Sequence, residues 1–383
     1  MSRALLACAL LLAAPAADAA GPPSFTVEGQ LRPRGIASTD GEGEAGGEIV
    51  STVTQRTRLG GRLTWGDLGL RVVSGQVRTL GVLPEPGAYG FHLPIALLAW
   101  SPGPLRLEVG RFQESLLQGR LINAGSWSQA GRSLDGARVA WREGSWAVEA
   151  RVHRLGEEHG APQGGILLSL AGGWHGAEWA LHPLAIFDRD AERGRDRWTQ
   201  GLSLEASGPG PWRGRAEGYL QGSREEGRVF VAGLIGGELT YAFPARFVPE
   251  VTLGYDLLSG DGRPGQGRAR AFDHLYGSSF SYYGHLQVVT REVGGRADGQ
   301  GLHDLVLKLH LAPWESGALG LHLHGFWAAV PTAEPFLGWE PDLFGQVDLH
   351  EALTLRGGGS LWMPPSAADR RVMIWTMLDL RFP

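Results

Sequence analysis

Residues 24–34 read SFTVEGQLRPR, and apolar and polar side chains alternate along this stretch. Phe25, Val27 and Leu31 share one side, whereas Glu28 and Arg32 share the other. Successive side chains of a β-strand point to opposite faces, so the alternation predicts a strand with one apolar and one polar face. A soluble sandwich would show the same period, so this stretch predicts a strand and leaves the architecture open.

The same alternation recurs along the chain between clusters of Gly, Pro, Asp and Ser, and it predicts about 18 strands. We expect them near residues 24–34, 52–65, 67–80, 93–101, 104–112, 134–142, 145–154, 165–174, 177–187, 197–208, 211–221, 228–242, 246–258, 301–312, 317–329, 339–348, 352–363 and 371–382. Residues 279–291 also alternate, but a further strand would make the total odd, so we expect a loop there.

The connections between these strands indicate the architecture. Short turns such as Gly66-Asp67 and Pro102-Gly103 alternate with longer polar loops along the whole chain. Outer-membrane barrels have short periplasmic turns and longer extracellular loops in this order. The sequence therefore predicts an all-β fold, a closed antiparallel transmembrane β-barrel. Its first strand should pair with its last, and both of its ends should lie in the periplasm.

Aromatic residues flank the short turns. Tryptophan and tyrosine collect at membrane interfaces, where an apolar ring and a polar N–H or O–H are both satisfied. We therefore expect a periplasmic girdle made of Trp65, Trp100, Trp141, Trp146, Trp174, Trp179, Trp212 and Tyr241.

The first residues indicate the compartment. Arg3 precedes an apolar run over residues 4–14, and Ala17-Asp18-Ala19 follows it. This order predicts a signal peptide over residues 1–19, with the barrel over residues 20–383 in the outer membrane of a Gram-negative cell. The only cysteine, Cys8, lies in the leader, where it fits a lipoprotein acylation site poorly.

In a membrane barrel the polar face lines the lumen, and here that face is rich in arginine. It holds Arg32, Arg34, Arg56, Arg58, Arg62, Arg106, Arg138, Arg142 and Arg151 against Glu28, Glu108 and Glu149. Many acids fall in the expected loops, so a cationic, anion-selective lumen is compatible with a formal net charge of -5. Arginine suits carboxylated cargo because its planar fork donates two parallel hydrogen bonds. Alternatively, the arginines only pair with lumen acids.

Two further stretches carry a family resemblance. The first runs from Leu107 to Trp141 and contains Gly110-Arg111-Phe112-Gln113, Gly119-Arg120-Leu121-Ile122, Trp127 and Gly131-Arg132-Ser133-Leu134-Asp135-Gly136. The second contains Gly254-Tyr255-Asp256, Ser259-Gly260-Asp261, Phe272-Asp273-His274-Leu275-Tyr276 and Tyr283-Gly284. Together they resemble the signatures of the alginate export porins. Leu134 stands where that family usually has an aromatic residue, and Pro383 follows the usual terminal Phe.

The resemblance implies an 18-stranded barrel with an electropositive lumen that passes a polyuronate outward. It also implies that Arg111, Arg120, Arg132 and Asp135 belong to a charged lumen and loop network. We expect these four residues to shape the narrowest part of the pore, with Asp135 holding arginines in place. The aromatic clusters within residues 260–301 should pack against or into the barrel mouth rather than stay in water.

Other functions fit the residues less well. An enzymatic barrel needs a nucleophile beside a base, and no serine lies suitably near His310, His322 or His324. We interpret these histidines as pore lining, and we expect no metal and no cofactor. The open alternative is an uptake porin for small anionic or apolar nutrients. Expected partners are outer-membrane lipid, an anionic polysaccharide and a periplasmic delivery scaffold, with no nucleic acid and a monomeric pore.

Overall fold

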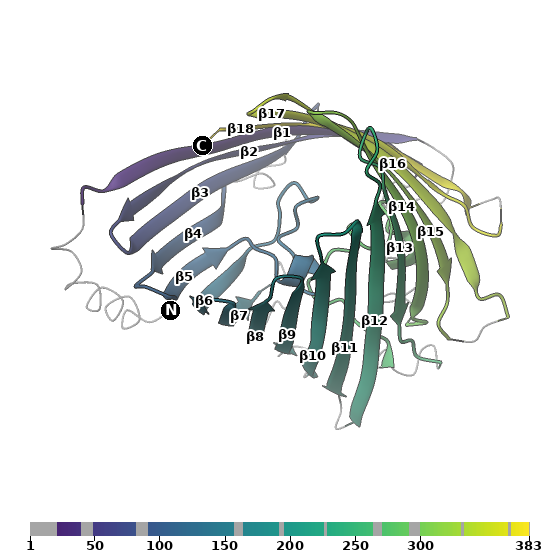
Figure 1. Ribbon diagram of the computed structural model, residues 1–383, viewed down its shortest axis with the longest axis horizontal. Coiled ribbons are helices and arrows are strands. Elements are labelled where there is room, and N and C mark those ends of the chain that lie inside the picture. The colour runs from purple at the N-terminus through teal and green to yellow at the C-terminus, as the bar shows by residue number, and fades with distance from the viewer. Residues whose placement is uncertain are drawn as a thin grey trace.

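The computed structural model describes residues 21–39, 49–81, 91–156, 164–190, 195–225, 228–262, 270–290, 299–330, 333–366 and 369–382. Eighteen strands form one sheet, as the alternation predicted (Figure 1). They are β1 Ser24–Ser38, β2 Val50–Trp65, β3 Leu68–Thr79, β4 His92–Trp100, β5 Leu105–Phe112, β6 Leu134–Glu143, β7 Trp146–Leu155, β8 Gly165–His175, β9 Trp179–Asp190, β10 Arg195–Ser207, β11 Trp212–Glu225, β12 Arg228–Ala242, β13 Glu250–Leu258, β14 Leu302–Trp314, β15 Gly317–Trp327, β16 Phe336–His350, β17 Leu353–Trp362 and β18 Arg371–Phe382.

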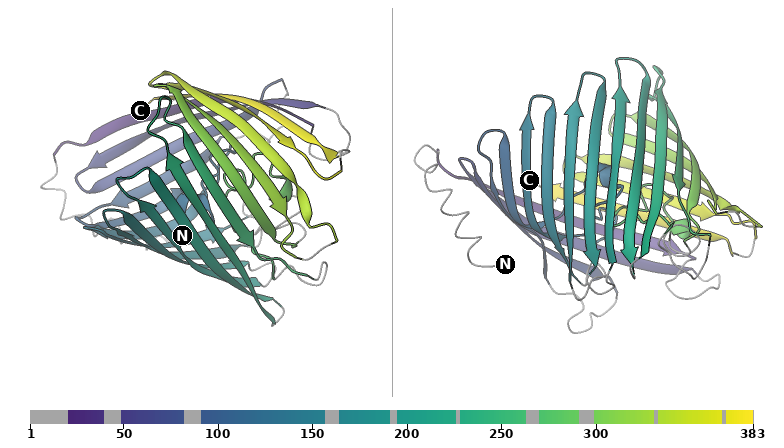
Figure 2. Two further views of the ribbon diagram at one scale, coloured as in Figure 1. Left: turned by 45° about the vertical axis from the view of Figure 1, so that its right-hand side comes forward. Right: turned by 90° about the horizontal axis from the view of Figure 1, so that it is seen from below.

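The sheet closes on itself. Each strand is antiparallel to its neighbours in the chain, and β1 also pairs with β18 over Gly29↔Phe382 to Ser38↔Met373. The prediction that the first strand pairs with the last is therefore confirmed. Figure 2 shows the strands surrounding one interior.

The two ends of the barrel differ. Ser24 lies opposite Thr64, next to the turn at Gly66-Asp67, and Phe382 lies close by on β18. Both barrel termini are thus at the end that carries the short turns, which we call the turn end; the other is the loop end. Within residues 279–290 no strand forms, as expected.

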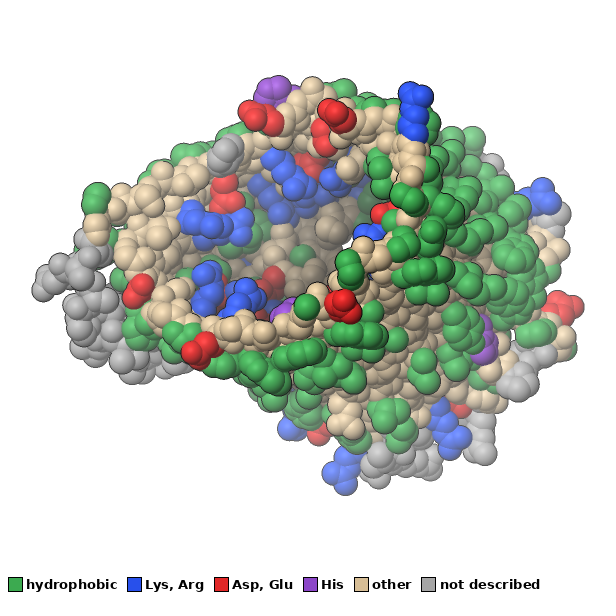
Figure 3. Space-filling view, viewed as in Figure 1, with side chains coloured by type: hydrophobic (Ala, Val, Ile, Leu, Met, Phe, Trp, Pro, Cys, Tyr) green, Lys and Arg blue, Asp and Glu red, His purple; other side chains and the backbone are tan. Residues whose placement is uncertain are grey.

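The outer wall is apolar. Phe25, Ile235 and Leu343 are 68%, 66% and 61% exposed, values that would be unfavourable for so many large apolar side chains in water. Figure 3 shows hydrophobic side chains spread over this wall. The eight aromatic residues of the expected girdle alternate in phase with the wall and lie at the turn end. In the described part of the chain, no helix has the length and apolarity needed to span a membrane.

The buried apolar cluster forms between the barrel wall and two loops that fold inside the barrel. The first inner loop is residues 113–133, and the second comprises the described residues 259–262, 270–290 and 299–301. Ile122 of the first and Phe272 of the second are 0% exposed and pack in one cluster with strand residues such as Leu234. The expectation that residues 260–301 pack into the barrel holds for their described part.

Closure can be tested with a disulfide. Leu31 and Leu380 face each other across the β1–β18 seam, where directly opposed Cα atoms lie about 5 Å apart. We expect Leu31→Cys/Leu380→Cys, in a chain that starts at residue 20, to form a disulfide readily. The bond would be read from the gel mobility of the unfolded chain. Leu31→Cys/Leu378→Cys is the control, because its diagonal separation of about 7–8 Å is unsuitable. Equal cross-linking of both pairs would contradict this register.

Candidate functional site

Arginines of β1 and β2 crowd one side of the interior, which we call the arginine wall (Arg32, Arg34, Arg56, Arg58 and Arg62). Arg32 and Arg56 are direct cross-strand partners, although like charges in that position repel. Nearby, the carboxylate of Asp379 accepts hydrogen bonds from Gln30 and Arg381, at 2.6 Å each. Figure 3 shows basic side chains gathered on the inner surface of the hollow.

The first inner loop stabilises the arginine wall with backbone carbonyls. Arg32 donates to the carbonyl oxygens of Ser126 and Ser128, each at 2.8 Å, and Arg58 donates to that of Ala130 at 3.1 Å. A carbonyl satisfies a guanidinium donor without cancelling its charge. The wall therefore stays positive even where its donors are occupied.

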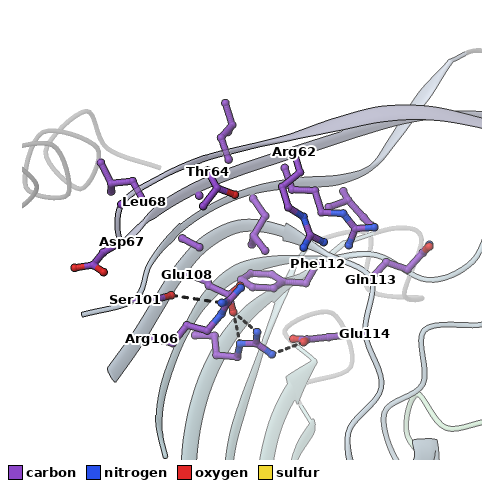
Figure 4. Close-up of a pocket in the computed structure, with 18 residues that line it drawn as sticks. Arg62, Thr64, Asp67, Leu68, Ser101, Arg106, Glu108, Phe112, Gln113 and Glu114 are labelled. Carbon is purple, nitrogen blue, oxygen red and sulfur yellow. Dashed lines mark hydrogen bonds and ion pairs between the residues drawn. The ribbon is translucent and has the colours of Figure 1, made fainter. Parts of the chain in front are cut away.

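Three inward arginines of β5 to β7 are neutralised instead. Arg106 donates to Glu108 at 2.8 Å, and Arg138 contacts Glu108 and Glu114, the latter at 2.5 Å (Figure 4). Arg151 contacts Glu114 at 3.2 Å and also Glu149. Three arginines thus face three glutamates, and Arg106, Glu108, Glu114 and Arg138 of this group line a cavity of about 520 Å³ that Arg62 also lines. Arg142 shares the inward side of β6 and is exposed near the turn end.

Arg120 is fully buried and joins the two inner loops to the barrel wall. Its guanidinium donates to Glu217 of β11 at 2.8 Å, to Asp256 of β13 at 2.8 and 3.0 Å, and to the Tyr283 hydroxyl at 2.8 Å. It also lies 3.8 Å from the ring centre of Tyr282. Burial disfavours its charge, but Tyr283, Asp256 and Glu217 hold the pKa of Arg120 well above its ordinary value. The expectation that Arg120 faces the pore is wrong, because these partners enclose it.

Arg132 joins the inner loops to each other. It donates to the backbone carbonyls of Asn123 and Tyr276, one in each loop. An isolated bridge between Ile122 and Tyr276 runs beside it. Arg132 therefore connects the first inner loop to the second.

A third connection was not predicted from the sequence. Arg197 of β10 donates to Asp188 of β9 at 2.9 and 3.1 Å and contacts Asp273 of the second inner loop at 2.5 Å. The Tyr276 hydroxyl donates to Asp188 at 3.0 Å. Asp273 and Tyr276 belong to the second stretch that resembles the family signature. No local sequence pattern, however, indicates that they contact Arg197 and Asp188 on the strands.

Arg111 and Asp135 lie on the outer wall, so the prediction that they shape the pore is wrong. On β5, every second residue from Glu108 to Phe112 points into the barrel, and on β6 the same holds from Leu134 to Arg138. Phe112 and Leu134 are each only 3% exposed. Arg111 and Asp135 occupy the intervening, outward positions. Asp135 does hold Arg111, through contacts of 2.9 and 3.1 Å.

Aromatic rings and arginines share a second cavity, of about 580 Å³, which we call the aromatic–arginine cavity. Trp127 of the first inner loop stacks on Phe280 of the second at 4.0 Å between ring centres, and Trp127 meets Trp375 of β18 edge-on at 5.1 Å. Phe280 also stacks on His285 at 4.2 Å. The basic members of the lining are Arg32, Arg56, Arg356 and Arg381.

Acidic residues lie on β14 and β16. The carboxylate of Asp304 lies 3.0 Å from Nδ1 of His324. The carboxylate of Glu340 accepts a hydrogen bond from the backbone N–H of Leu286 at 2.7 Å. Asp342 accepts the N–H of His285 at 3.3 Å, so this acidic group anchors the second inner loop. Across the described residues, no group of three or more His, Cys, Asp or Glu is placed to hold a metal ion.

Comparisons with known proteins agree with this architecture. A family model described as "Alginate export" matches residues 95–332. A search of curated proteins finds no match.

OccK11 (OpdR) of Pseudomonas aeruginosa is similar in structure, with 14% identity, a TM-score of 0.65, and coverage of 94% of this chain and 96% of that one. OpdK of the same organism, solved with vanillate, has 12% identity, a TM-score of 0.64, and coverage of 93% and 99%. OccAB1 of Acinetobacter baumannii has 11% identity, a TM-score of 0.67, and coverage of 94% and 96%. At these identities the likeness shows the fold alone.

The role of Arg120 can be tested by removing its charge. Arg120→Met would leave Glu217 and Asp256 without a buried cation, at a cost of about 3–5 kcal/mol. We expect a lower unfolding temperature and faster proteolytic cleavage of the first inner loop. Arg120→Met/Glu217→Gln/Asp256→Asn should recover most of the resistance, because no unpaired charge remains. A single variant as resistant as the parent would overturn this role.

Proposed function

The chain belongs to the alginate export family, and from this membership we propose that its barrel passes an anionic polyuronate outward by passive diffusion. Family and fold are those of outer-membrane pores. The proposal includes a secretory leader over residues 1–19, which lie outside the described residues, together with a monomeric pore and a periplasmic delivery partner.

The aromatic–arginine cavity is the observation that carries this proposal. A pyranose ring has an apolar face that packs on aromatic side chains, and a uronate adds one carboxylate per ring. Trp127, Phe280 and Trp375 line this cavity with aromatic carbon atoms, and Arg56 and Arg356 border the same space. Within the described residues, the Nε atom of Arg356 is buried and has no hydrogen-bond partner, so the protein leaves one donor of this guanidinium unused.

The uneven charge of the interior supports the same cargo. The arginine wall is positive, the β5–β7 group is neutral, and carboxylates collect on β14 and β16. A charged inner surface bounded by low-dielectric walls raises the local concentration of oppositely charged solutes. An anionic chain would therefore travel along β1 and β2.

Uptake of a small aromatic carboxylate is the second candidate. OpdK was solved with vanillate, and a cavity of about 580 Å³ is within the range that holds small molecules. Ring stacking and an arginine would recognise such a compound as well as a uronate. The two candidates differ in whether a long chain or only a single ring engages the pore.

Selectivity tests the charge argument. We expect the parent channel to prefer chloride over potassium, most strongly at about 0.01 M salt, where the screening length is about 30 Å. Arg62→Glu should weaken or reverse this preference, because Arg62 is exposed to the lumen. The reversal potential across a KCl gradient in a planar bilayer measures it. Arg246→Glu, in the turn between β12 and β13, is the matched control and should change little. A parent channel that prefers potassium would contradict a cationic pore.

Channel block tests the cargo. Uronate oligomers should interrupt the current of the parent channel, whereas neutral oligosaccharides of equal length should not. Arg356→Gln should weaken the block about tenfold, because a charge-assisted hydrogen bond to the carboxylate is lost. Arg246→Gln should leave the block unchanged.

Each outcome of the block experiment decides between the candidates. Block by vanillate without block by uronate oligomers would favour uptake of small carboxylates. Absence of block by either would count against both. Where oligomers do block, accumulation of uronate polymer in the periplasm of a deletion strain would support outward passage, and undiminished release would contradict it.

A further inference from the structure

A row of charged side chains crosses the outer wall at the loop end. The row runs from β5 to β11, with one residue on each strand. Each residue lies directly opposite the next one in the register of the neighbouring strands. The outer row consists of Arg111, Asp135, Arg154, Ile166, Arg189, Asp196 and Arg224. The strands that carry it form the wall nearest the viewer in the right-hand view of Figure 2.

The outer row faces away from the lumen. On β7 the inward residues Arg151, His153 and Leu155 are buried, whereas Val152 and Arg154 between them are exposed. The Arg189 side chain on β9 is 62% exposed and alternates with buried Asp188. Strand alternation therefore places the row on the same side as the apolar wall.

The row also marks the limit of that wall. On most of its strands the next outward residue toward the turn end is apolar: Val109, Ala137, Val152, Leu168, Phe187 and Trp198. If the apolar wall lies in hydrocarbon, the row lies where lipid headgroups begin. Charged side chains at that depth reach headgroups directly.

Positive charge is in excess along the row. It contains four arginines and two aspartates. Asp135 fixes Arg111 at 2.9 Å, and Asp196 lies 3.6 Å from Arg189. Within the described residues, Arg154 and Arg224 form no ion pair.

From this arrangement we propose that the outer row binds the phosphate groups of a phosphorylated lipid in the outer leaflet. Guanidinium groups bind phosphate with two parallel hydrogen bonds. Neighbouring strands are about 4.8 Å apart, so arginines on every second strand are spaced at about 10 Å along the row. Such a row can contact several headgroup phosphates at once. The inference requires membrane insertion but is independent of the cargo in the lumen.

Lipid binding can be measured on the folded barrel in detergent micelles. Lipid A with two phosphates is added, and bound lipid is counted by native mass spectrometry. Arg189→Gln/Arg224→Gln should weaken binding about 25-fold, because each arginine near a headgroup contributes about fivefold. Lipid A stripped of phosphate should bind the parent and the variant equally.

The control removes two arginines from the other end of the barrel. Arg213 and Arg246 lie near the turns between β10 and β13. The variant Arg213→Gln/Arg246→Gln should bind lipid A as the parent does. Arg154→Gln alone, with an expected loss of about fivefold, tests the row if the double variant does not fold. Equal binding by the row variants and the parent, or an equal loss in the control, would overturn the proposal.

Discussion

A backbone amide in hydrocarbon has no water to bond, and this requirement organises the whole molecule. Each unsatisfied N–H or C=O costs several kcal/mol there, so a strand can cross only if both of its edges are paired. The β1–β18 seam meets that requirement for the first and last strands. Because the sheet is closed, its polar face is directed inward. The crowding of charge in the lumen follows from backbone hydrogen bonding.

Charge crowded in an enclosed space must itself be satisfied, and the barrel does this in three ways. Carbonyls of the first inner loop accept hydrogen bonds from the arginine wall and leave it positive. Glutamates neutralise Arg106, Arg138 and Arg151 on the inner side of β5 to β7. Arg120 and Arg197 form buried ion pairs that hold the loops. Only the first arrangement leaves an uncompensated positive charge, so the number of arginines overstates the positive field.

Strand alternation was sufficient to predict the fold and the lumen face of most arginines. Arg56 and Arg62 lie inward because each is an even number of residues from the other along one strand. The same rule applied from Glu108 places Arg111 outside, whereas the family resemblance implies a position in the lumen and loop network. A signature identifies residues that occur together without fixing the face on which they lie. Glu217 and Asp256 lie 97 and 136 residues from Arg120, so no local pattern could connect them.

Those long separations bear on the order of folding. Arg120 meets Glu217, Asp256 and Tyr283 only after β11, β13 and the second inner loop exist, and Tyr283 is 163 residues away. Contacts so distant in the chain form late, because loop closure must come first. A Cβ atom at Gly236 would lie 3.2 Å from the Arg120 guanidinium and 2.1 Å from Asp256, so the docking space is nearly full. The close fit around Arg120 therefore requires β11 and β13 to be in place when the two inner loops dock.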